Sequence, residues 1–186
     1  MRIIAGKFRG RNLEAPHSNG IRPTSDRLRE SIFNILEHNY DYAADHARVL
    51  DLFAGTGACG LEALSRGAEY AVFVDTGTEA RGIIRRNIEK LGVGGISRIF
   101  RRDATCLGSA HPNQPFSLVF CDPPYGKGLT VTALSSCREG GWLASDALII
   151  AEDEKGVDPL IPADGFEFLE ERIYGETRIQ FARYRK

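Results

Sequence analysis

Apolar residues along this chain recur in two alternating patterns, short continuous runs and runs with helical spacing. The short runs, which predict buried strands, lie at Val49–Phe53, Tyr70–Asp75, Ile96–Phe100, Phe116–Cys121 and Ala147–Glu152. Behind the first two of them, apolar positions three or four residues apart predict helices that stop at Gly67 and Gly92. Strands and helices that alternate in this way are typical of a mostly parallel sheet with helices on both faces.

The beginning of the chain follows a different pattern. Arg2–Ala5 and Arg11–Ala15 predict two short strands around a basic turn, which is a small β-hairpin. After a polar stretch, Thr24 or Ser25 is expected to cap a helix. The apolar positions of this helix recur at helical spacing, at Leu28, Ile32, Ile35 and Leu36.

The end of the chain reads as an antiparallel hairpin, with Phe166–Ile173 and Arg178–Tyr184 on either side of a turn at residues 174–176. The whole pattern predicts a Rossmann-like α/β fold whose mostly parallel sheet has seven strands and ends in this hairpin. Within the 186 residues we expect a basic hairpin and linker at 1–24 and one larger domain at 25–186.

Charge is unevenly distributed along the chain. The net charge is -1, yet residues 1–36 contain seven basic and three acidic side chains and carry +4. A basic arm on a mildly acidic body indicates a nucleic-acid surface, and an ordinary solvated surface is the alternative.

Metal and membrane sites are not predicted. The four cysteines show no paired spacing and no nearby histidine cluster, so we expect reduced thiols, no bound metal and a cytoplasmic protein. No apolar stretch reaches membrane-spanning length, and the start lacks the apolar region of a signal peptide.

A glycine-rich loop follows the first predicted parallel strand. Gly55-x-Gly57-x-x-Gly60 leads from that strand into a helix, and Asp75 lies twenty positions after Gly55. This is the pattern of a dinucleotide-binding loop with its ribose-binding acid. The motif alone fits a nicotinamide enzyme and an S-adenosylmethionine enzyme equally, and a purely structural turn is a third interpretation.

Acidic residues favour S-adenosylmethionine over a diphosphate. Asp51, Asp75 and Asp103 end three successive predicted strands, and their charges would repel a diphosphate, although the helix dipole offsets part of this. The same charges suit a sulfonium and an amino group. Asp75 is expected to bind the ribose hydroxyls, and Asp103 with Ala104 the adenine amine. The predicted cofactor-binding residues of this part are Asp51, Phe53, Ala54, Gly55, Thr56, Gly57, Asp75, Asp103 and Ala104.

Asp122-Pro123-Pro124-Tyr125 follows the fourth predicted parallel strand. That strand is usually a neighbour of the first, so Asp122 is expected to face the cofactor's methyl group. The Asp122 carboxylate and the Pro123 carbonyl would accept hydrogen bonds from an exocyclic amine, and Tyr125 would stack on the flipped-out base. We therefore assign catalysis to Asp122, Pro123 and Tyr125, with Asp122 also near the cofactor, against the alternative of an ordinary turn.

The residues resemble a known family, the RsmD-type bacterial 16S ribosomal RNA guanine-N2 methyltransferases. The resemblance covers nearly the whole chain. It rests on two widely shared methyltransferase motifs, Asp51–Gly67 and Asp122–Tyr125, and on two more specific segments, Arg2–Gly10 and Arg22–Asn34. Two departures are visible, since the family often carries Glu at position 75 and Ser at position 56.

The resemblance implies a class I methyltransferase fold with a small N-terminal β-hairpin extension. It implies methyl transfer from S-adenosylmethionine, with S-adenosylhomocysteine as product, to N2 of one guanine in 16S rRNA. The expected substrate is an assembled or partly assembled 30S subunit, and a monomeric enzyme is expected. The Arg22–Asn34 segment would line the donor pocket, with Arg22 and Thr24 near the cofactor. The expected RNA contacts are Arg2, Lys7, Arg9, Arg11, Arg22 and Arg27.

Three other functions fit parts of the sequence. An adenine-N6 methyltransferase acting on DNA would use the same tetrapeptide, but 186 residues leave no room for a separate base-reading domain. A non-catalytic RNA-binding assembly factor would not need Asp122, Tyr125 and a full glycine loop. A nicotinamide oxidoreductase is disfavoured by the acidic residues at the strand ends.

Overall fold

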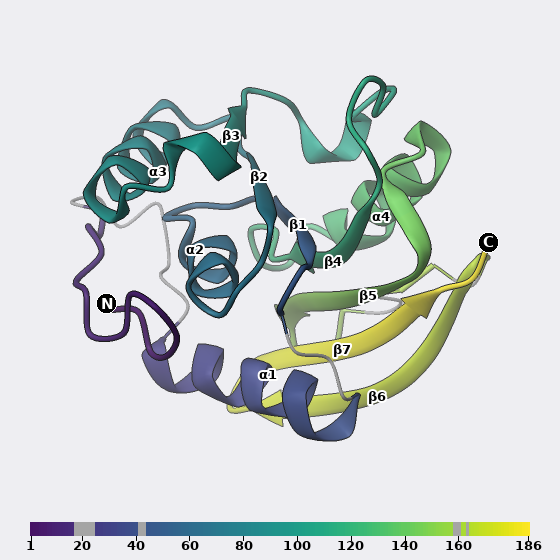
Figure 1. Cartoon of the computed structure of the whole chain (residues 1–186). Helices are drawn as coiled ribbons and strands as arrows, with labels where there is room; N and C mark the ends of the chain where they lie inside the picture. The colour runs from purple at the N-terminus through teal and green to yellow at the C-terminus, as the bar shows by residue number, and fades with distance from the viewer. Residues whose placement is uncertain (17–24, 41–43, 158–160, 163) are drawn as a thin grey trace. The chain divides into compact units, whose positions relative to one another are not determined.

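The computed structural model describes residues 1–16, 25–40, 44–157, 161–162 and 164–186, and its main elements are labelled in Figure 1. The chain divides into two compact units, Met1–Arg101 and Arg102–Lys186. Arg22 and Thr24 lie outside the described residues, so their predicted roles and the predicted domain boundary at residue 24 stay predictions.

The first unit is built on three parallel strands in the order β3-β2-β1. These strands are β1 (Arg48–Leu52), β2 (Tyr70–Val74) and β3 (Ser97–Phe100). The helical segments of this unit are α1 (Asp26–Asn39), α2 (Ala58–Ser65), α3 (Thr78–Leu91) and the short 3-10 turn η1 (Gly94–Ile96). Every residue of β1 and β2 after the first is buried, as expected for strands covered on both faces.

Helix α1 begins at the predicted place. The Ser25 hydroxyl accepts a hydrogen bond from the Leu28 N–H at 3.1 Å, which makes Ser25 the N-cap. Leu28 and Ile35, which the spacing assigned to the apolar face, are only partly buried. The buried face instead consists of Arg29, Ile32, Phe33 and Leu36.

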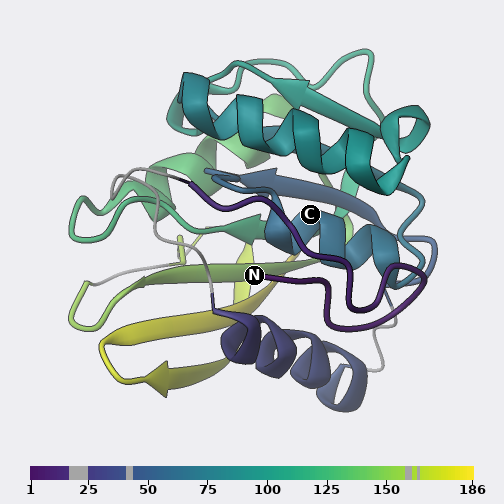
Figure 2. The same ribbon diagram turned by 90° about the vertical axis from the view of Figure 1, so that its left-hand side faces the viewer.

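The amino-terminal hairpin is less regular than predicted. It reverses direction with a single antiparallel bridge, between Arg2 and Asn12, in place of two regular strands. The physical reason is that Ile4 and Ala5 direct their N–H groups to the Glu62 carboxylate on α2, at 2.8 and 3.0 Å, and so leave the ladder. Figure 2 shows the purple amino-terminal segment running beside α2.

The second unit contains four strands in the order β4-β5-β7-β6. Strand β4 pairs parallel with β5, whereas β7 pairs antiparallel with both β5 and β6. The strands are β4 (Phe116–Cys121), β5 (Leu143–Glu154), β6 (Phe166–Tyr174) and β7 (Thr177–Tyr184). With the three strands of the first unit they make up the predicted seven, and the closing hairpin is confirmed.

Two helical segments of the second unit complete the fold, the 3-10 turn η2 (Ala104–Cys106) and α4 (Leu129–Gly140). The sequence did not predict α4, because three of its four buried positions carry a small or polar side chain. These four positions are Thr130, Ala133, Leu134 and Cys137.

The described residues also bear on metals, thiols and membranes. All four cysteines are free thiols. Within the described ranges, no group of three or more His, Cys, Asp or Glu side chains is arranged to hold a metal ion. Across the same ranges, each helix is too short or too polar to span a bilayer.

Candidate active site

The glycine loop of the first unit needs glycine at three positions. Gly55 and Gly57 have φ angles of +56° and +76°, in the left-handed region that glycine adopts without strain. The Gly57 N–H donates to the Ala54 carbonyl at 2.7 Å, which closes the turn before α2. At Gly60 a Cβ atom would lie 2.5 Å from the Phe73 ring on β2. The loop therefore brings α2 unusually close to β2.

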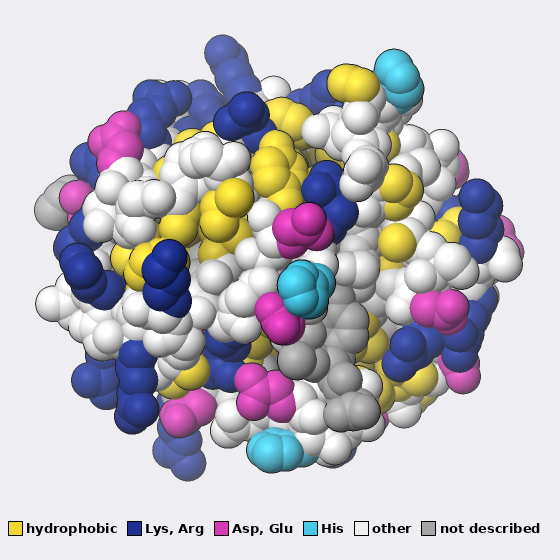
Figure 3. Space-filling view, viewed as in Figure 1, with side chains coloured by type: hydrophobic (Ala, Val, Ile, Leu, Met, Phe, Trp, Pro, Cys, Tyr) yellow, Lys and Arg dark blue, Asp and Glu magenta, His cyan; other side chains and the backbone are white. Residues whose placement is uncertain are grey.

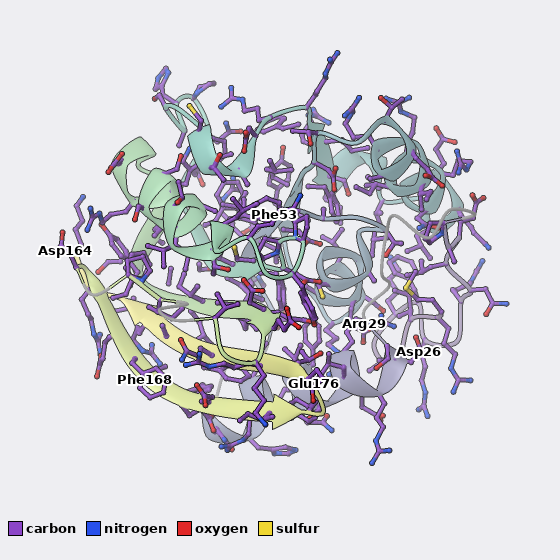
Figure 4. The ribbon with its side chains drawn as sticks, turned by 180° about the vertical axis from the view of Figure 1, so that it is seen from behind. Asp26, Arg29, Phe53, Asp164, Phe168 and Glu176 are labelled. Atoms are coloured by element: carbon purple, nitrogen blue, oxygen red, sulfur yellow. The ribbon has the colours of Figure 1, made fainter. Side chains whose placement is uncertain are left out.

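Phe53 lies just before this loop in a conformation that is rare for its residue type. Its φ angle is +55°, and its side chain, labelled in Figure 4, is only partly buried. Backbone strain of this kind costs about 1–3 kcal/mol and gathers at functional sites, where the surrounding structure holds it. The structure holds Phe53 in this conformation beside the glycine loop, and its cofactor role stays a prediction.

Asp75 is fixed by the loop that it was predicted to serve. One carboxylate oxygen accepts the Gly55 N–H at 2.9 Å, and the other accepts the Gly77 N–H at 2.7 Å. Asp75 is partly exposed, and each of its oxygens keeps a second lone pair for a hydroxyl donor. Such a carboxylate is suited to a ribose diol, and that contact stays a prediction.

Asp51 lies beneath the same loop and is buried. Its carboxylate accepts the Gly60 N–H at 2.9 Å. Burial raises the pKa of Asp51 to about 7, against the lowering effect of this hydrogen bond, and the nearby charge of Asp75 raises it further. Asp51 thus holds α2 against β1, and a direct cofactor contact for it stays a prediction.

Asp103 and Ala104 belong to the second unit. The exposed Asp103 carboxylate caps η2, where it accepts the Thr105 N–H at 2.9 Å and the Thr105 hydroxyl at 2.7 Å. These hydrogen bonds lower the pKa of Asp103, so it is ionised at neutral pH. Ala104 is buried. Recognition of adenine by this pair stays a prediction.

The tetrapeptide begins directly where β4 ends at Cys121. Asp122 is partly exposed, whereas Pro123 is buried. The Tyr125 hydroxyl lies 2.7 Å from Oε1 of Glu152, to which it donates, and 2.8 Å from the Thr177 hydroxyl. Tyr125 is therefore held by its far end, and its ring is oriented from β5 and β7.

The protonation state of Tyr125 follows from this environment. Burial raises the pKa of its hydroxyl well above the usual range, and the charges of Glu152 and Asp122 raise it further. Tyr125 consequently stays neutral, and its stacking on a base stays a prediction.

Two supporting acids were missed by the sequence reasoning. Glu152 anchors Tyr125, and the fully buried Asp153 accepts the N–H groups of Gly126 at 3.2 Å and Glu154 at 2.7 Å. Asp153 thereby fixes the loop that follows the tetrapeptide. A run of three acids ending the apolar stretch from Ala147 was the available signal.

The basic residues predicted for RNA contact are exposed wherever the structure describes them. These residues are Arg2, Lys7, Arg9, Arg11 and Arg27. Arg29 was counted among the seven basic residues of the predicted positive arm. It is buried, so it does not belong to the exposed basic surface. It donates to Asp26 at 3.0 Å and lies 3.7 Å from Glu62, with Arg29 and Asp26 labelled in Figure 4. The positive charge of Arg29 is therefore paired with carboxylates inside the first unit.

Comparison with known proteins gives one consistent family. The family described as "Conserved hypothetical protein 95" matches residues 1–183. Ribosomal RNA small subunit methyltransferase D of Escherichia coli strain K12 is 38% identical over 179 residues, which cover 95% of this chain and 86% of that protein. The protein of the same name from Haemophilus influenzae is 36% identical over 177 residues, or 94% of this chain and 89% of its own length.

Solved structures agree with the predicted fold. The yhhF protein of Escherichia coli has a TM-score of 0.83 at 34% identity, covering 100% of this chain and 98% of that one. The HI0767 protein of Haemophilus influenzae has a TM-score of 0.79 at 32% identity, with the same coverage. The Rossmann-like methyltransferase fold is confirmed, and the chain belongs to the RsmD-type family of small-subunit ribosomal RNA methyltransferases.

Proposed function

We propose that this protein transfers a methyl group from S-adenosylmethionine to the exocyclic N2 amine of one guanine in 16S rRNA. The observation that carries the proposal is the Asp122–Tyr125 tetrapeptide at the end of β4, with Tyr125 anchored through its hydroxyl at Glu152 and Thr177. Action as a monomer on an assembled or partly assembled 30S subunit belongs to the same proposal.

The residues of the first unit fit S-adenosylmethionine. Gly57, the N-cap of α2, has no side chain to cap the helix, so the carboxylate of the methionine part could approach the helix N-terminus there, while Asp51 already accepts the Gly60 N–H. Asp75 would accept from the ribose hydroxyls, and Asp103 of the second unit from the adenine amine. S-adenosylmethionine, when bound, supplies an electrophilic methyl group and leaves as S-adenosylhomocysteine.

The second unit would prepare the base. The lone pair of an exocyclic amine is delocalised into the ring, so the amine is a poor nucleophile. Hydrogen bonds from the amine to the Asp122 carboxylate and the Pro123 carbonyl would favour a pyramidal nitrogen with a directed lone pair. Tyr125 would stack on the ring, a contact worth about 1–3 kcal/mol. Asp122 is then the orienting group and the acceptor of the released proton.

The first test is Asp122→Ala, measured by mass mapping of methylated nucleotides in 16S rRNA from unmodified small subunits. We expect methyl transfer to be abolished and S-adenosylmethionine affinity to change by no more than a few fold, because the variant removes only the amine acceptor. Asp164→Asn, at an exposed carboxylate of the same unit, is the matched control and is expected to keep full activity.

Other outcomes would favour other functions. No turnover in the unaltered protein with RNA binding intact would support a non-catalytic assembly factor. Unchanged turnover in Asp122→Ala would overturn the role proposed for Asp122. Methylation of duplex DNA alone would support an adenine-N6 enzyme, because the tetrapeptide suits either amine. Mapping the methyl group to a position other than guanine N2 would overturn the proposed chemistry.

A further inference from the structure

Positive charge in the first unit is concentrated in two segments, of which the predicted hairpin is only one. Residues 1–16 and 76–101 together contain ten Lys and Arg against three Glu, a net charge of +7, so the rest of the chain carries -8. The ten basic residues are Arg2, Lys7, Arg9, Arg11, Arg81, Arg85, Arg86, Lys90, Arg98 and Arg101. In Figure 3, Lys and Arg side chains gather on the side where α3 and the amino-terminal segment lie.

The two segments are joined by specific hydrogen bonds. The Glu14 N–H donates to the Asn87 side chain on α3 at 2.7 Å, and the Asn87 amide returns a bond to the Glu14 carbonyl at 3.4 Å. Asn87 is fully buried, so this junction is part of the packed structure. Arg86 also donates to the Glu14 carboxylate at 2.5 Å. The end of the amino-terminal segment is therefore fixed to α3 at Glu14.

Helix α3 presents its cations outward. Its inner face is apolar, with Ile83, Ile84 and Ile88 buried, whereas Arg85 and Lys90 are exposed. Glu14 neutralises Arg86 and thereby uses up the only acid of residues 1–16. Arg98 on β3, a strand that α3 contacts, is exposed as well. Glu79 and Glu89 of α3 are exposed as well, but together with Glu14 they offset only three of the ten cations, whereas an ordinary solvated face carries both signs in similar number.

We propose that the exposed face of α3 and β3, at Arg85, Lys90 and Arg98, binds RNA phosphates and continues the surface formed by the amino-terminal segment. This inference rests on the proposed function for its partner, RNA. A surface with an excess of exposed cations attracts the repeating negative charge of a nucleic-acid backbone. Phosphate contacts of this kind position the substrate and carry no sequence information.

The test is the triple variant R85Q/K90Q/R98Q. Its binding to unmodified 16S rRNA is measured across a range of salt concentrations. Each phosphate contact adds about 0.7–0.9 to the slope of log affinity against log salt, so we expect the slope to fall by about 2. Affinity for S-adenosylmethionine and the thermal midpoint are expected to stay unchanged, since all three side chains are exposed.

The matched control is K155Q/R172Q/K186Q, which removes three exposed cations from the second unit and changes the net charge equally. If the slope of log affinity against log salt falls equally in both triple variants, the effect is due to net charge alone and the inference is overturned. An unchanged slope in the α3 variant would overturn it as well. If the slope falls only in the α3 variant but the unaltered protein never methylates RNA, the RNA-binding surface is supported and the proposed function is rejected.

Discussion

At the scale of single residues, the ring of Tyr125, which we propose stacks on the base, is oriented through its hydroxyl. Tyr125→Phe keeps the ring but removes the hydroxyl from Glu152 and Thr177, both of which are buried. Two buried polar groups then lose a partner, and we expect the free energy of unfolding to fall by about 1–3 kcal/mol. The kcat/KM for RNA should fall as well, because the ring is no longer held in one orientation.

The measurements are urea unfolding and methylation kinetics, with S-adenosylmethionine affinity as an internal check. Tyr184→Phe is the control, because Tyr184 is also buried in the second unit and packs its ring against Phe166. If Tyr125→Phe matches the unaltered protein in both stability and kcat/KM, the hydroxyl anchor is irrelevant.

Asp51 makes the stability of the protein depend on pH in an unusual direction. Its pKa is about 7 in the folded protein, far above the ordinary value for Asp. Between about pH 4 and about pH 7 the unfolded chain has therefore released a proton that the folded chain keeps. The contribution of Asp51 to the free energy of unfolding is therefore fully present below about pH 4. It is lost as the pH rises through about 7.

Asp51→Asn should remove this dependence, because an amide oxygen still accepts the Gly60 N–H and never ionises. We expect the free energy of unfolding of the unaltered protein to fall relative to this variant from about pH 4 to about pH 7. Asp103→Asn is the control, since the pKa of Asp103 is lowered and its effect is confined to more acidic pH. A constant difference between the Asp51 variant and the unaltered protein would contradict the assignment.

At the scale of elements, α2 holds the amino-terminal hairpin through the Glu62 carboxylate and through Ser65, whose hydroxyl accepts the Phe8 N–H at 2.9 Å. Glu62 is buried and accepts from Ile4 and Ala5, and it also pairs with Arg66 at 2.9 Å and lies 3.7 Å from the buried Arg29. The helix that begins at the glycine loop is thus also the support of the segment predicted to grip RNA. The geometry of one depends on the geometry of the other.

Glu62→Gln and Glu37→Gln form a matched pair, because both acids bind Arg66 and only Glu62 is buried. We expect Glu62→Gln to cost about 1–3 kcal/mol, because it removes the charge that faces the buried Arg29 and leaves a single acceptor oxygen for the Ile4 and Ala5 N–H groups. Replacing the exposed Glu37 by Gln should lower the free energy of unfolding by about 1 kcal/mol or less. Chemical unfolding gives both values, and faster hydrogen exchange at Ile4 and Ala5 should accompany the first variant alone. Equal costs would mean that burial of Glu62 contributes nothing.

At the scale of the whole molecule, the regular alternation of the sequence predicted most of the strands. Phe116–Cys121 was located to the residue, because its apolar run is bounded by a proline on one side and by Asp122-Pro123 on the other. The glycine loop and the tetrapeptide were also predictable, since both are short motifs with a fixed place after a strand.

Features that depend on distant partners were not predictable. Arg29 reads as a surface cation until Glu62, thirty-three positions later, is packed against it. The Tyr125 anchor requires the antiparallel pairing that puts Glu152 of β5 near Thr177 of β7. The prediction of two regular hairpin strands was wrong for the same reason, because the Glu62 carboxylate of α2 accepts the N–H groups that would otherwise pair between the strands.

The left-handed backbone at Phe53 has a consequence for laboratory evolution. Glycine would adopt the same φ of +55° without penalty, so screening variants of this position for survival after heating should enrich glycine. Screening the same library for modified ribosomes should retain the aromatic ring if it serves the donor. The two selections are thus expected to drive position 53 apart, and sequencing the survivors of each would reveal what the benzyl group contributes.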